Sequence, residues 1–151
     1  MEYILQTNAL SKHYKDCKAL NNLSMNVPKG AIYGFVGKNG AGKTTLIRII
    51  CGLQNPTEGT YSLYGKDFKD KNILKIRRRM CAIVETPAIY LDMTAKENMY
   101  QQYRILGIPS FDDIDEKLKL VGLENTGKKK AKNFSLGMKQ RLGIAISLAG
   151  D

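Results

Sequence analysis

Hydrophobic and polar positions divide the chain into an early part with strand-like segments and a later part with helical periodicity. Short apolar stretches between turn residues, at 3–10, 22–27 and 60–65, predict strands. Two continuous apolar runs, AIYGFV at 31–36 and MCAIV at 80–84, are typical of strands that are buried on both faces of a sheet. We therefore expect the early part to contain a sheet with buried central strands.

Apolar residues that recur every three or four positions predict the helices. The first helix should cover 43–53, because Leu46, Ile50 and Leu53 share one face and Gly52 can end it. The other helical segments are expected near 71–78, 95–106, 114–121 and 138–149. The last of these is apolar on all sides, which is typical of a helix buried by its surroundings.

Polar capping signals mark where the later helices should begin. Thr94 and Glu97 have the spacing of a capping box, in which each side chain satisfies a free backbone amide of the other residue. Ser110 and Asp113 repeat this spacing before the next helix. The chain is thus expected to continue as a helical subdomain after its strands.

Length and composition fit one soluble domain built from two subdomains. The chain has 151 residues, the length of one ordinary domain. We place the internal boundary near residue 87, with an α/β part at 1–86 and a helical part at 87–151. No apolar run approaches the ~18 residues of a membrane span, and the start lacks the basic and apolar segments of a signal peptide.

Charge and cysteine usage narrow the function only slightly. Lysine and arginine number 24 against 14 acidic residues, a formal charge of +10, with basic runs at 77–79 and 128–130. Neither run is interleaved with aromatic residues, as single-strand binders usually are. We favour solvated loop charge, and binding of an anionic ligand or a membrane-side partner is the alternative. Cys17, Cys51 and Cys81 are odd in number and widely spaced, which favours reduced thiols.

Residues 37–44 read GKNGAGKT and match the phosphate-loop pattern G-x-x-x-x-G-K-[ST]. Glycines let backbone amides fold around phosphate oxygens, and the following helix directs its positive N-terminal end at the same anion. Lys43 can reach the outer phosphates and is the candidate catalytic residue, while the Thr44 hydroxyl can coordinate Mg²⁺. The predicted nucleotide-binding residues of the loop are Gly37, Asn39, Gly40, Ala41, Gly42, Lys43, Thr44 and Thr45. The alternative, a glycine-rich turn with a solvated lysine, is disfavoured by the strand-like run before the loop and the helix after it.

A second segment, FSLGMKQR at 134–141, resembles the signature of ATP-binding-cassette (ABC) ATPase subunits, whose common form is Leu-Ser-Gly-Gly-Gln. Ser135 and Gly137 match that form, whereas Leu136 and Met138 replace a glycine and a glutamine. A serine hydroxyl and glycine amides at a helix start make a second anion-binding end. The resemblance implies that these four residues cover the γ-phosphate of ATP held by a partner subunit.

Two further residues take their roles from the same resemblance. Tyr14 stands where the family places an aromatic ring that stacks on adenine; without the resemblance it would be interpreted as a packing residue. Glu85 stands where most members carry a glutamine that contacts Mg²⁺ and the attacking water. Glutamate can also ligate Mg²⁺, because hard cations take oxygen ligands. The implied metal ligands are therefore Thr44 and Glu85.

The resemblance covers essentially the whole chain but only part of a family domain. In the family, an apolar strand ending in an Mg²⁺-binding aspartate, a catalytic glutamate and a γ-phosphate-sensing histidine follow the signature helix. None of these is present in the 151 residues, whose single histidine, His13, belongs to the opening hairpin. We expect an incomplete ABC ATPase domain with a P-loop NTPase core, an N-terminal antiparallel β subdomain and a helical subdomain. It should bind ATP without hydrolysing it.

The function that the resemblance implies is that of an ATP-binding subunit of an ABC transporter. The stretches ETPAIYLDMTAKENM and FSLGMKQRLGIA are most similar to the bacitracin- and lantibiotic-resistance branch, which suggests drug or peptide-antibiotic efflux. The implied cofactors are ATP and Mg²⁺, and the implied partners are a transmembrane permease and a second ATP-binding subunit in a head-to-tail dimer. The expected place is cytoplasmic, at the inner face of the cell membrane, with no nucleic acid partner.

Two alternatives remain open from the sequence. One is a non-transport ABC ATPase that acts on nucleic acid or the ribosome. The other is a small P-loop kinase or GTPase that uses Glu85 as its Mg²⁺-side acid.

Overall fold

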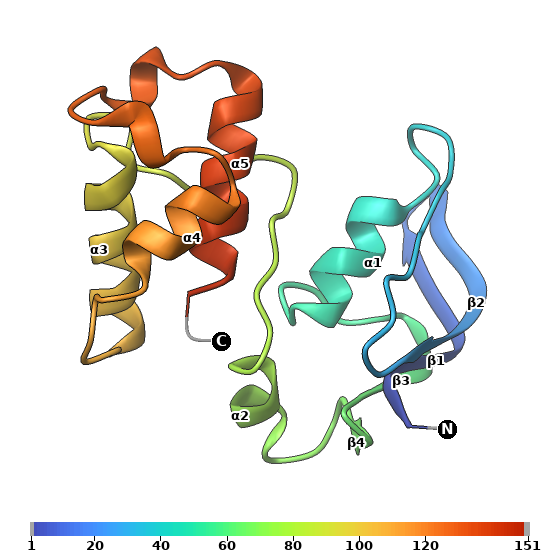
Figure 1. The fold of residues 1–151 in the computed structure, drawn as a ribbon. Coiled ribbons are helices and arrows are strands. Elements are labelled where there is room, and N and C mark those ends of the chain that lie inside the picture. Colours follow the sequence, from blue (N-terminus) through green and yellow to red (C-terminus); the bar gives the residue numbers. More distant parts are fainter. Residues whose placement is uncertain (1, 150–151) are drawn as a thin grey trace. The chain divides into compact units, whose positions relative to one another are not determined.

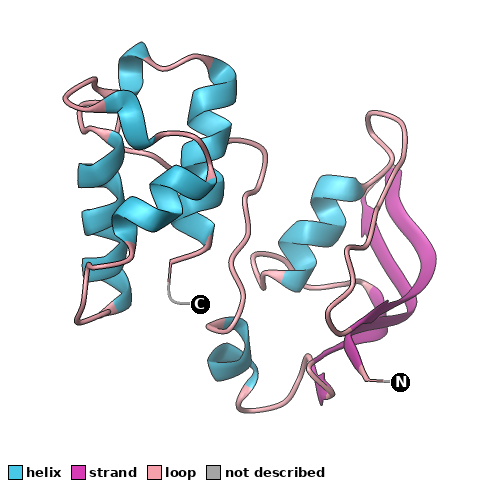
Figure 2. Ribbon diagram, in the orientation of Figure 1, coloured by secondary structure: helices cyan, strands magenta, loops and turns pink. Residues whose placement is uncertain are grey.

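The computed structural model describes residues 2–149, which fall into two compact units, Met1–Ala82 and Ile83–Asp151 (Figure 1). The division comes slightly before the boundary near residue 87 that the sequence suggests. The first unit contains a sheet with two helices, and the second contains helices and turns (Figure 2).

The first unit is built on a four-stranded antiparallel sheet with the order β2-β1-β3-β4. Its strands are β1 (Tyr3–Tyr14), β2 (Cys17–Pro28), β3 (Glu58–Leu63) and β4 (Lys66–Asp67). The helices α1 (Lys43–Ile50) and α2 (Ile73–Arg77) complete the unit. The hairpin of β1 and β2 is longer than the apolar stretches predict, because hydrogen-bonded pairing continues through polar residues up to the pair Tyr14 and Cys17.

The core of this unit joins α1 to the sheet. Leu46 and Ile49 of α1 are buried, and they belong to one cluster with Leu10 of β1 and Leu20 of β2. The predicted face of α1 was partly wrong, because the helix ends at Ile50 and leaves Leu53 66% exposed. The apolar side of α1 therefore anchors the amino end of this helix beside the hairpin.

Neither of the two continuous apolar runs forms a strand, so this prediction was wrong. Residues 31–36 and 80–84 have no regular structure, and Ile32 and Val36 are 105% and 93% exposed (Figure 2). An apolar run favours a buried strand. A strand forms, however, only when a neighbouring strand provides hydrogen-bond partners for its backbone N–H and C=O groups. Within residues 2–149 the paired strands are those of the antiparallel sheet, and neither run joins them.

The second unit packs three helices around one core. They are α3 (Ala95–Leu106), α4 (Ile114–Leu120) and α5 (Leu136–Ser147), with two short 3-10 turns, η1 (Glu124–Thr126) and η2 (Ala131–Asn133). Met99 and Tyr103 of α3, Ile114 of α4 and Leu142 of α5 are each 1% exposed or less. Together they form the core of this unit.

One of the two expected capping boxes is confirmed. The Thr94 amide donates to Glu97 Oε2 at 2.6 Å, and the Glu97 amide donates to Thr94 Oγ1 at 3.2 Å. The second was wrong, because α4 has Asp113 as its N-cap and no side-chain cap hydrogen bond. Ser110 is used instead in a local turn, where its hydroxyl donates to Asp112 Oδ2 at 2.6 Å.

The helix α5 is closely approached by the segment that opens this unit. A Cβ added at Gly143 would lie 2.5 Å from Pro87 Cβ and 3.3 Å from Ile83 Cδ1. The neighbouring Ile144 is 45% exposed, so α5 has one tightly covered side and one open apolar position, and the expectation of a helix buried on all sides was only partly right. Glycine at position 143 is therefore required by packing rather than by backbone conformation.

Replacing Gly143 by alanine should destabilise the protein, although alanine favours a helix over glycine by about 1 kcal/mol. The added methyl group overlaps Pro87, and overpacking of this kind costs about 1–3 kcal/mol. The matched control is Gly137→Ala in the same helix, where the new Cβ meets no heavy atom within 4 Å. Urea unfolding followed by circular dichroism should show a lower midpoint for Gly143→Ala alone; equal midpoints would contradict the packing.

Candidate nucleotide-binding site

The predicted phosphate loop leads directly into the amino end of α1. Residues 37–42 form the loop, and Lys43, Thr44 and Thr45 form the first turn of the helix. The N-cap residue is Gly42, and the first turn contains no acidic residue. The positive end of the helix dipole is therefore not neutralised by a carboxylate, which is the condition for attracting an anion.

Lys43 holds its ammonium group against the loop that it follows. Its Nζ donates to the carbonyl of Gly37 at 2.5 Å and to the carbonyl of Lys38 at 2.8 Å. The amide of Ala41 donates to the same Lys38 carbonyl at 3.1 Å, which closes the loop into a turn. A cation is thus placed at the loop itself, where phosphate oxygens could replace the carbonyls as its partners.

The position of α1 depends on glycine at residue 42. Gly42 has a φ of 83°, a left-handed conformation that L side chains rarely adopt. A Cβ at this position would lie only 2.0 Å from the carbonyl oxygen of Ala19 and 2.9 Å from a methyl of Leu20, both in β2. The start of the helix therefore touches the backbone of the hairpin, which a side chain would prevent.

Tyr14 lies in the same unit, at the end of β1. Tyr14 is 41% exposed, and its hydroxyl donates to Gln54 Oε1 at 2.5 Å. Gln54 belongs to the loop that follows α1, so this loop connects the tyrosine to the phosphate-loop helix. The ring is accessible to a planar ligand and is held by a defined partner.

Ser135 caps the helix that follows the predicted signature. It is the N-cap of α5, and its Oγ accepts a hydrogen bond from the amide of Met138 at 3.2 Å. Leu136 is 69% exposed, and a Cβ at Gly137 would meet no atom within 4 Å. The start of α5 is thus an open, serine-capped helix end without an acidic residue in its first turn.

Glu85 belongs to the second unit, whereas Thr44 belongs to the first. Its backbone is left-handed, with a φ of 66°, which is uncommon for a residue other than glycine. The flanking residues Ile83 and Pro87 are those that pack against Gly143 of α5. The segment of Glu85 is therefore fixed to the helix that carries the signature.

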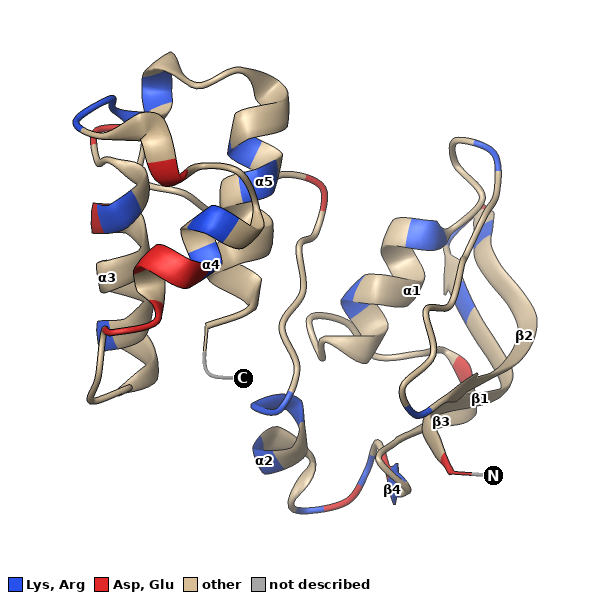
Figure 3. Ribbon diagram, in the orientation of Figure 1, with Lys and Arg blue, Asp and Glu red and all other residues tan. Residues whose placement is uncertain are grey.

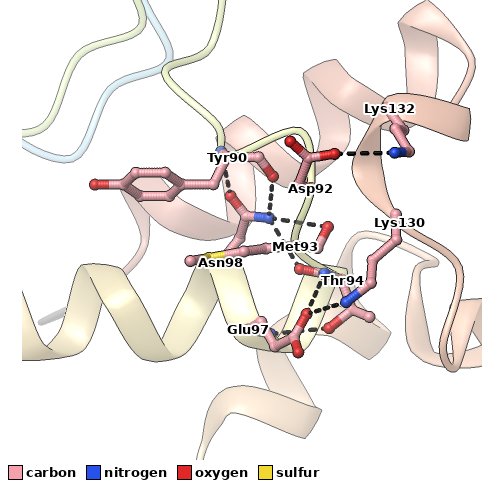
Figure 4. Close-up of polar contacts among 8 residues, drawn as sticks. All are labelled: Tyr90, Asp92, Met93, Thr94, Glu97, Asn98, Lys130 and Lys132. Atoms are coloured by element: carbon pink, nitrogen blue, oxygen red, sulfur yellow. Dashed lines mark hydrogen bonds and ion pairs between the residues drawn. The ribbon is translucent and has the colours of Figure 1, made fainter.

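A buried asparagine that the sequence did not reveal organises the segment before α3 (Figure 4). Asn98 is 2% exposed, and its Nδ2 donates to the carbonyls of Thr94 at 2.9 Å and Tyr90 at 3.0 Å. Its Oδ1 accepts from the amide of Tyr90 at 2.7 Å. One side chain thus satisfies both backbone groups of Tyr90, and it folds residues 90–94 over the start of the helix.

The same segment is fastened to the chain that precedes the signature. The amides of Ala131 and Lys132 donate to the carbonyls of Met93 and Leu91, both at 2.8 Å. Lys132 Nζ also forms an ion pair with Asp92 Oδ1 at 3.0 Å (Figure 4). Residues 90–94 and η2 are therefore one connected piece of structure, and η2 ends two residues before Ser135.

The basic residues of the two runs partly serve the fold itself. Lys130 Nζ pairs with Glu97 Oε2 at 3.0 Å (Figure 4), and the pKa of Glu97 is lowered by the hydrogen bond from the Thr94 backbone and by Lys130. Arg77 donates to the Ile50 carbonyl at 3.2 Å and to the Tyr61 hydroxyl at 2.6 Å, and burial raises the pKa of Tyr61. Figure 3 marks lysine and arginine positions along the ribbons of both units. Solvated loop charge therefore describes these runs only incompletely.

Residues 2–149 contain neither a membrane-spanning helix nor a cluster of metal-binding side chains. None of the described helices combines the length and the hydropathy needed to cross a bilayer. No cluster of three or more His, Cys, Asp or Glu side chains that could hold a metal occurs among the described residues. The oxygen of Thr44 at the start of α1 still fits Mg²⁺ chemistry, because this ion takes few protein ligands and keeps phosphate oxygens and waters.

A comparison with protein-family models shows the family to which the chain belongs. The family model of the ABC transporter matches residues 20–151, which include the phosphate loop, the Glu85 segment and the signature. The chain belongs to the ABC transporter family. The serine-capped start of α5, which was predicted to be the signature, lies within the matched residues.

Curated ABC relatives match the chain almost from end to end. The bacitracin transport ATP-binding protein BcrA of Bacillus licheniformis is 48% identical over 148 residues, which are 98% of this chain and 48% of BcrA. The lantibiotic transport ATP-binding protein SrtF of Streptococcus pyogenes is 42% identical over 145 residues, 96% of this chain and 61% of SrtF. The chain spans about half the length of the BcrA relative that it matches. The predicted resemblance to the bacitracin and lantibiotic branch is confirmed.

Solved structures of ABC subunits confirm the fold class. The Clostridium perfringens protein cbiO1, part of the ABC transporter complex cbiONQ, aligns with a TM-score of 0.79 at 26% identity over 98% of this chain and 62% of cbiO1. An ATP binding subunit of an ABC transporter aligns with a TM-score of 0.77 at 30% identity, over 95% of this chain and 61% of that subunit. The chain therefore has the architecture of an incomplete ABC ATPase domain.

Asn98 should be essential to the stability of the second unit. In Asn98→Leu, the part-buried amide and carbonyl of Tyr90 lose their partner, and an unsatisfied buried group costs up to about 1–3 kcal/mol. The matched control is Asn125→Leu, because Asn125 is exposed in η1. Urea unfolding should show a loss of this size for Asn98→Leu and little change for the control. A stable Asn98→Leu protein would contradict the role given to this side chain.

Proposed function

We propose that this chain is the ATP-binding part of an ABC transporter and that it binds MgATP at the amino end of α1. The observation that carries the proposal is the placement of Lys43 and Gly42, which puts an ammonium group and the positive end of a helix at one glycine-rich loop. Such an arrangement binds phosphate through backbone amides, the helix dipole and a point charge together. Family membership supports a nucleoside triphosphate as this anion.

Each remaining site residue has a distinct part in this proposal. Loop residues Gly37, Asn39, Gly40, Ala41 and Gly42 would surround the β- and γ-phosphates, and Thr45 would add a first-turn amide. Thr44 and Glu85 would supply oxygen ligands to Mg²⁺, which neutralises phosphate charge when bound. Tyr14 would stack on the adenine ring.

The signature at the start of α5 is proposed to act on a second nucleotide. Ser135, Leu136, Gly137 and Met138 form an open helix end that attracts anions for the same physical reason as α1 does. In the proposed head-to-tail dimer, this end covers the ATP bound to the other ATP-binding subunit. The connection of residues 90–94 to η2 supports a mechanical role for this unit, because a force on that segment would reach Ser135.

The transport function follows from the relatives and remains part of the proposal. BcrA and SrtF are transport ATP-binding proteins for bacitracin and a lantibiotic, so we propose efflux of a drug or peptide antibiotic through a transmembrane permease. The subunit would lie in the cytoplasm, at the inner face of the membrane, and would need no nucleic acid partner. Purification of the protein with its membrane subunit is the direct test of this assignment.

Lys43→Ala should remove most of the affinity for ATP. The substitution deletes the ammonium group at the loop, and charge-assisted hydrogen bonds to phosphate are stronger than neutral ones. Isothermal calorimetry with MgATP is the measurement. Lys66→Ala, at an exposed position of β4, is the matched control because it removes the same charge from the same unit. Equal affinity of the two variants would show that the nucleotide does not bind at this loop.

The 151 residues by themselves should bind ATP without turning it over. Phosphoryl transfer to water requires a held metal and a positioned nucleophile. The family's Mg²⁺-binding aspartate and catalytic glutamate, which follow the signature helix, are not among these residues. Release of inorganic phosphate should stay at the level of the Lys43→Ala variant. Steady phosphate release that Lys43→Ala abolishes would disprove the expectation and would require a base within this chain.

A further inference from the structure

We infer that Gln54 is a positioning residue for the adenine-stacking ring, an inference that rests on the proposed nucleotide site. Its Oε1 accepts the hydrogen bond from the Tyr14 hydroxyl at 2.5 Å. Without this contact, the tyrosine would be the last residue of an exposed hairpin strand with a ring free to change its rotamer. The hydrogen bond fixes the far end of the ring, so that its plane is oriented before a base arrives.

A second contact supports the orientation of the same ring. Lys12 Nζ lies 5.3 Å from the centroid of the Tyr14 ring, in a cation–π arrangement, and donates to the carbonyl of Asn55 at 2.8 Å. The lysine therefore bridges the ring and the residue that follows Gln54. Because 41% of the tyrosine remains exposed despite these two contacts, surface is still available for a base to stack on it.

The loop that carries Gln54 is itself joined to the end of β1. The amide of His13 donates to Thr57 Oγ1 at 3.1 Å, and the amide of Thr57 donates to the carbonyl of Ser11 at 2.8 Å. This loop directly follows α1, the helix whose other end holds Lys43. The adenine ring and the phosphates would thus be bound near opposite ends of the same helix. The length of α1 and its following loop would set the distance between the two binding positions.

Such preorganisation affects base binding and leaves phosphate binding unchanged. A ring that is held in place loses less rotational freedom when a ligand binds, which raises affinity without a new contact to the ligand. Removal of the tether should therefore weaken ATP and spare a ligand that has phosphates but no base. Inorganic tripolyphosphate is that ligand.

The test compares MgATP and Mg-tripolyphosphate binding by calorimetry for Gln54→Leu, Tyr14→Phe and the double variant, all in the 151-residue chain. Each single variant should bind ATP about two- to tenfold more weakly, the range expected for loss of one neutral hydrogen bond. The double variant should lose no more than either single one, because both remove the same bond. Tripolyphosphate affinity should stay constant throughout.

The control is Gln6→Leu, which removes a glutamine that donates to Asn26 Oδ1 elsewhere in the sheet and should leave ATP binding unchanged. Wild-type ATP affinity in Gln54→Leu, additive losses in the double variant or an equal loss for tripolyphosphate would each overturn the inference while the nucleotide site stands. An unsubstituted chain that binds neither ligand would overturn the nucleotide site and this inference with it.

Discussion

The close approach of Gly42 to the backbone of β2 is the constraint on which the proposed nucleotide site depends. A side chain there would overlap the Ala19 carbonyl, so the phosphate-loop helix can reach the hairpin only through a glycine. Once α1 is seated, Leu46 and Ile49 bury its other side against the sheet. The amino end of the helix then stays open to an anion, because the residue that caps it has no side chain.

The second unit also has a helix end that can attract an anion, but there a side chain caps the helix. Its anion-attracting helix end begins at Ser135, whose hydroxyl caps α5. The chain before this serine is tied to residues 90–94 by backbone hydrogen bonds and an ion pair, and Asn98 fixes those residues from inside. Polar groups that are buried with all their partners hold a loop in one shape more specifically than apolar contacts do. Residues 90–94 and the start of α5 therefore belong to one connected framework.

Much of the candidate site could be predicted from local sequence, because its chemistry requires particular residues at fixed spacings. The glycines, Lys43 and Thr44 are recognisable from the phosphate-loop pattern, and Ser135 is recognisable from its place at a helix start. Asn98 and Gln54 could not be found in this way. Each forms hydrogen bonds with a residue outside its own segment. No sequence pattern indicates which residue a single asparagine or glutamine will contact. The second capping box failed for a similar reason, since Asp113 instead accepts hydrogen bonds from Tyr103 and pairs with Lys117.

The sequence by itself determined the helices, most of their apolar faces, the phosphate-loop pattern and the family, because these depend on periodicity and on short spacings. Tertiary structure alone decided which apolar runs become strands. Residues 31–36 and 80–84 have the composition of buried strands, yet a strand needs a paired neighbour, and pairing is a property of two segments. Tertiary structure also decided where glycine is indispensable. Nothing in the sequence distinguishes Gly143 from other helical residues. Only the close approach of Pro87 explains why a side chain does not fit at this position.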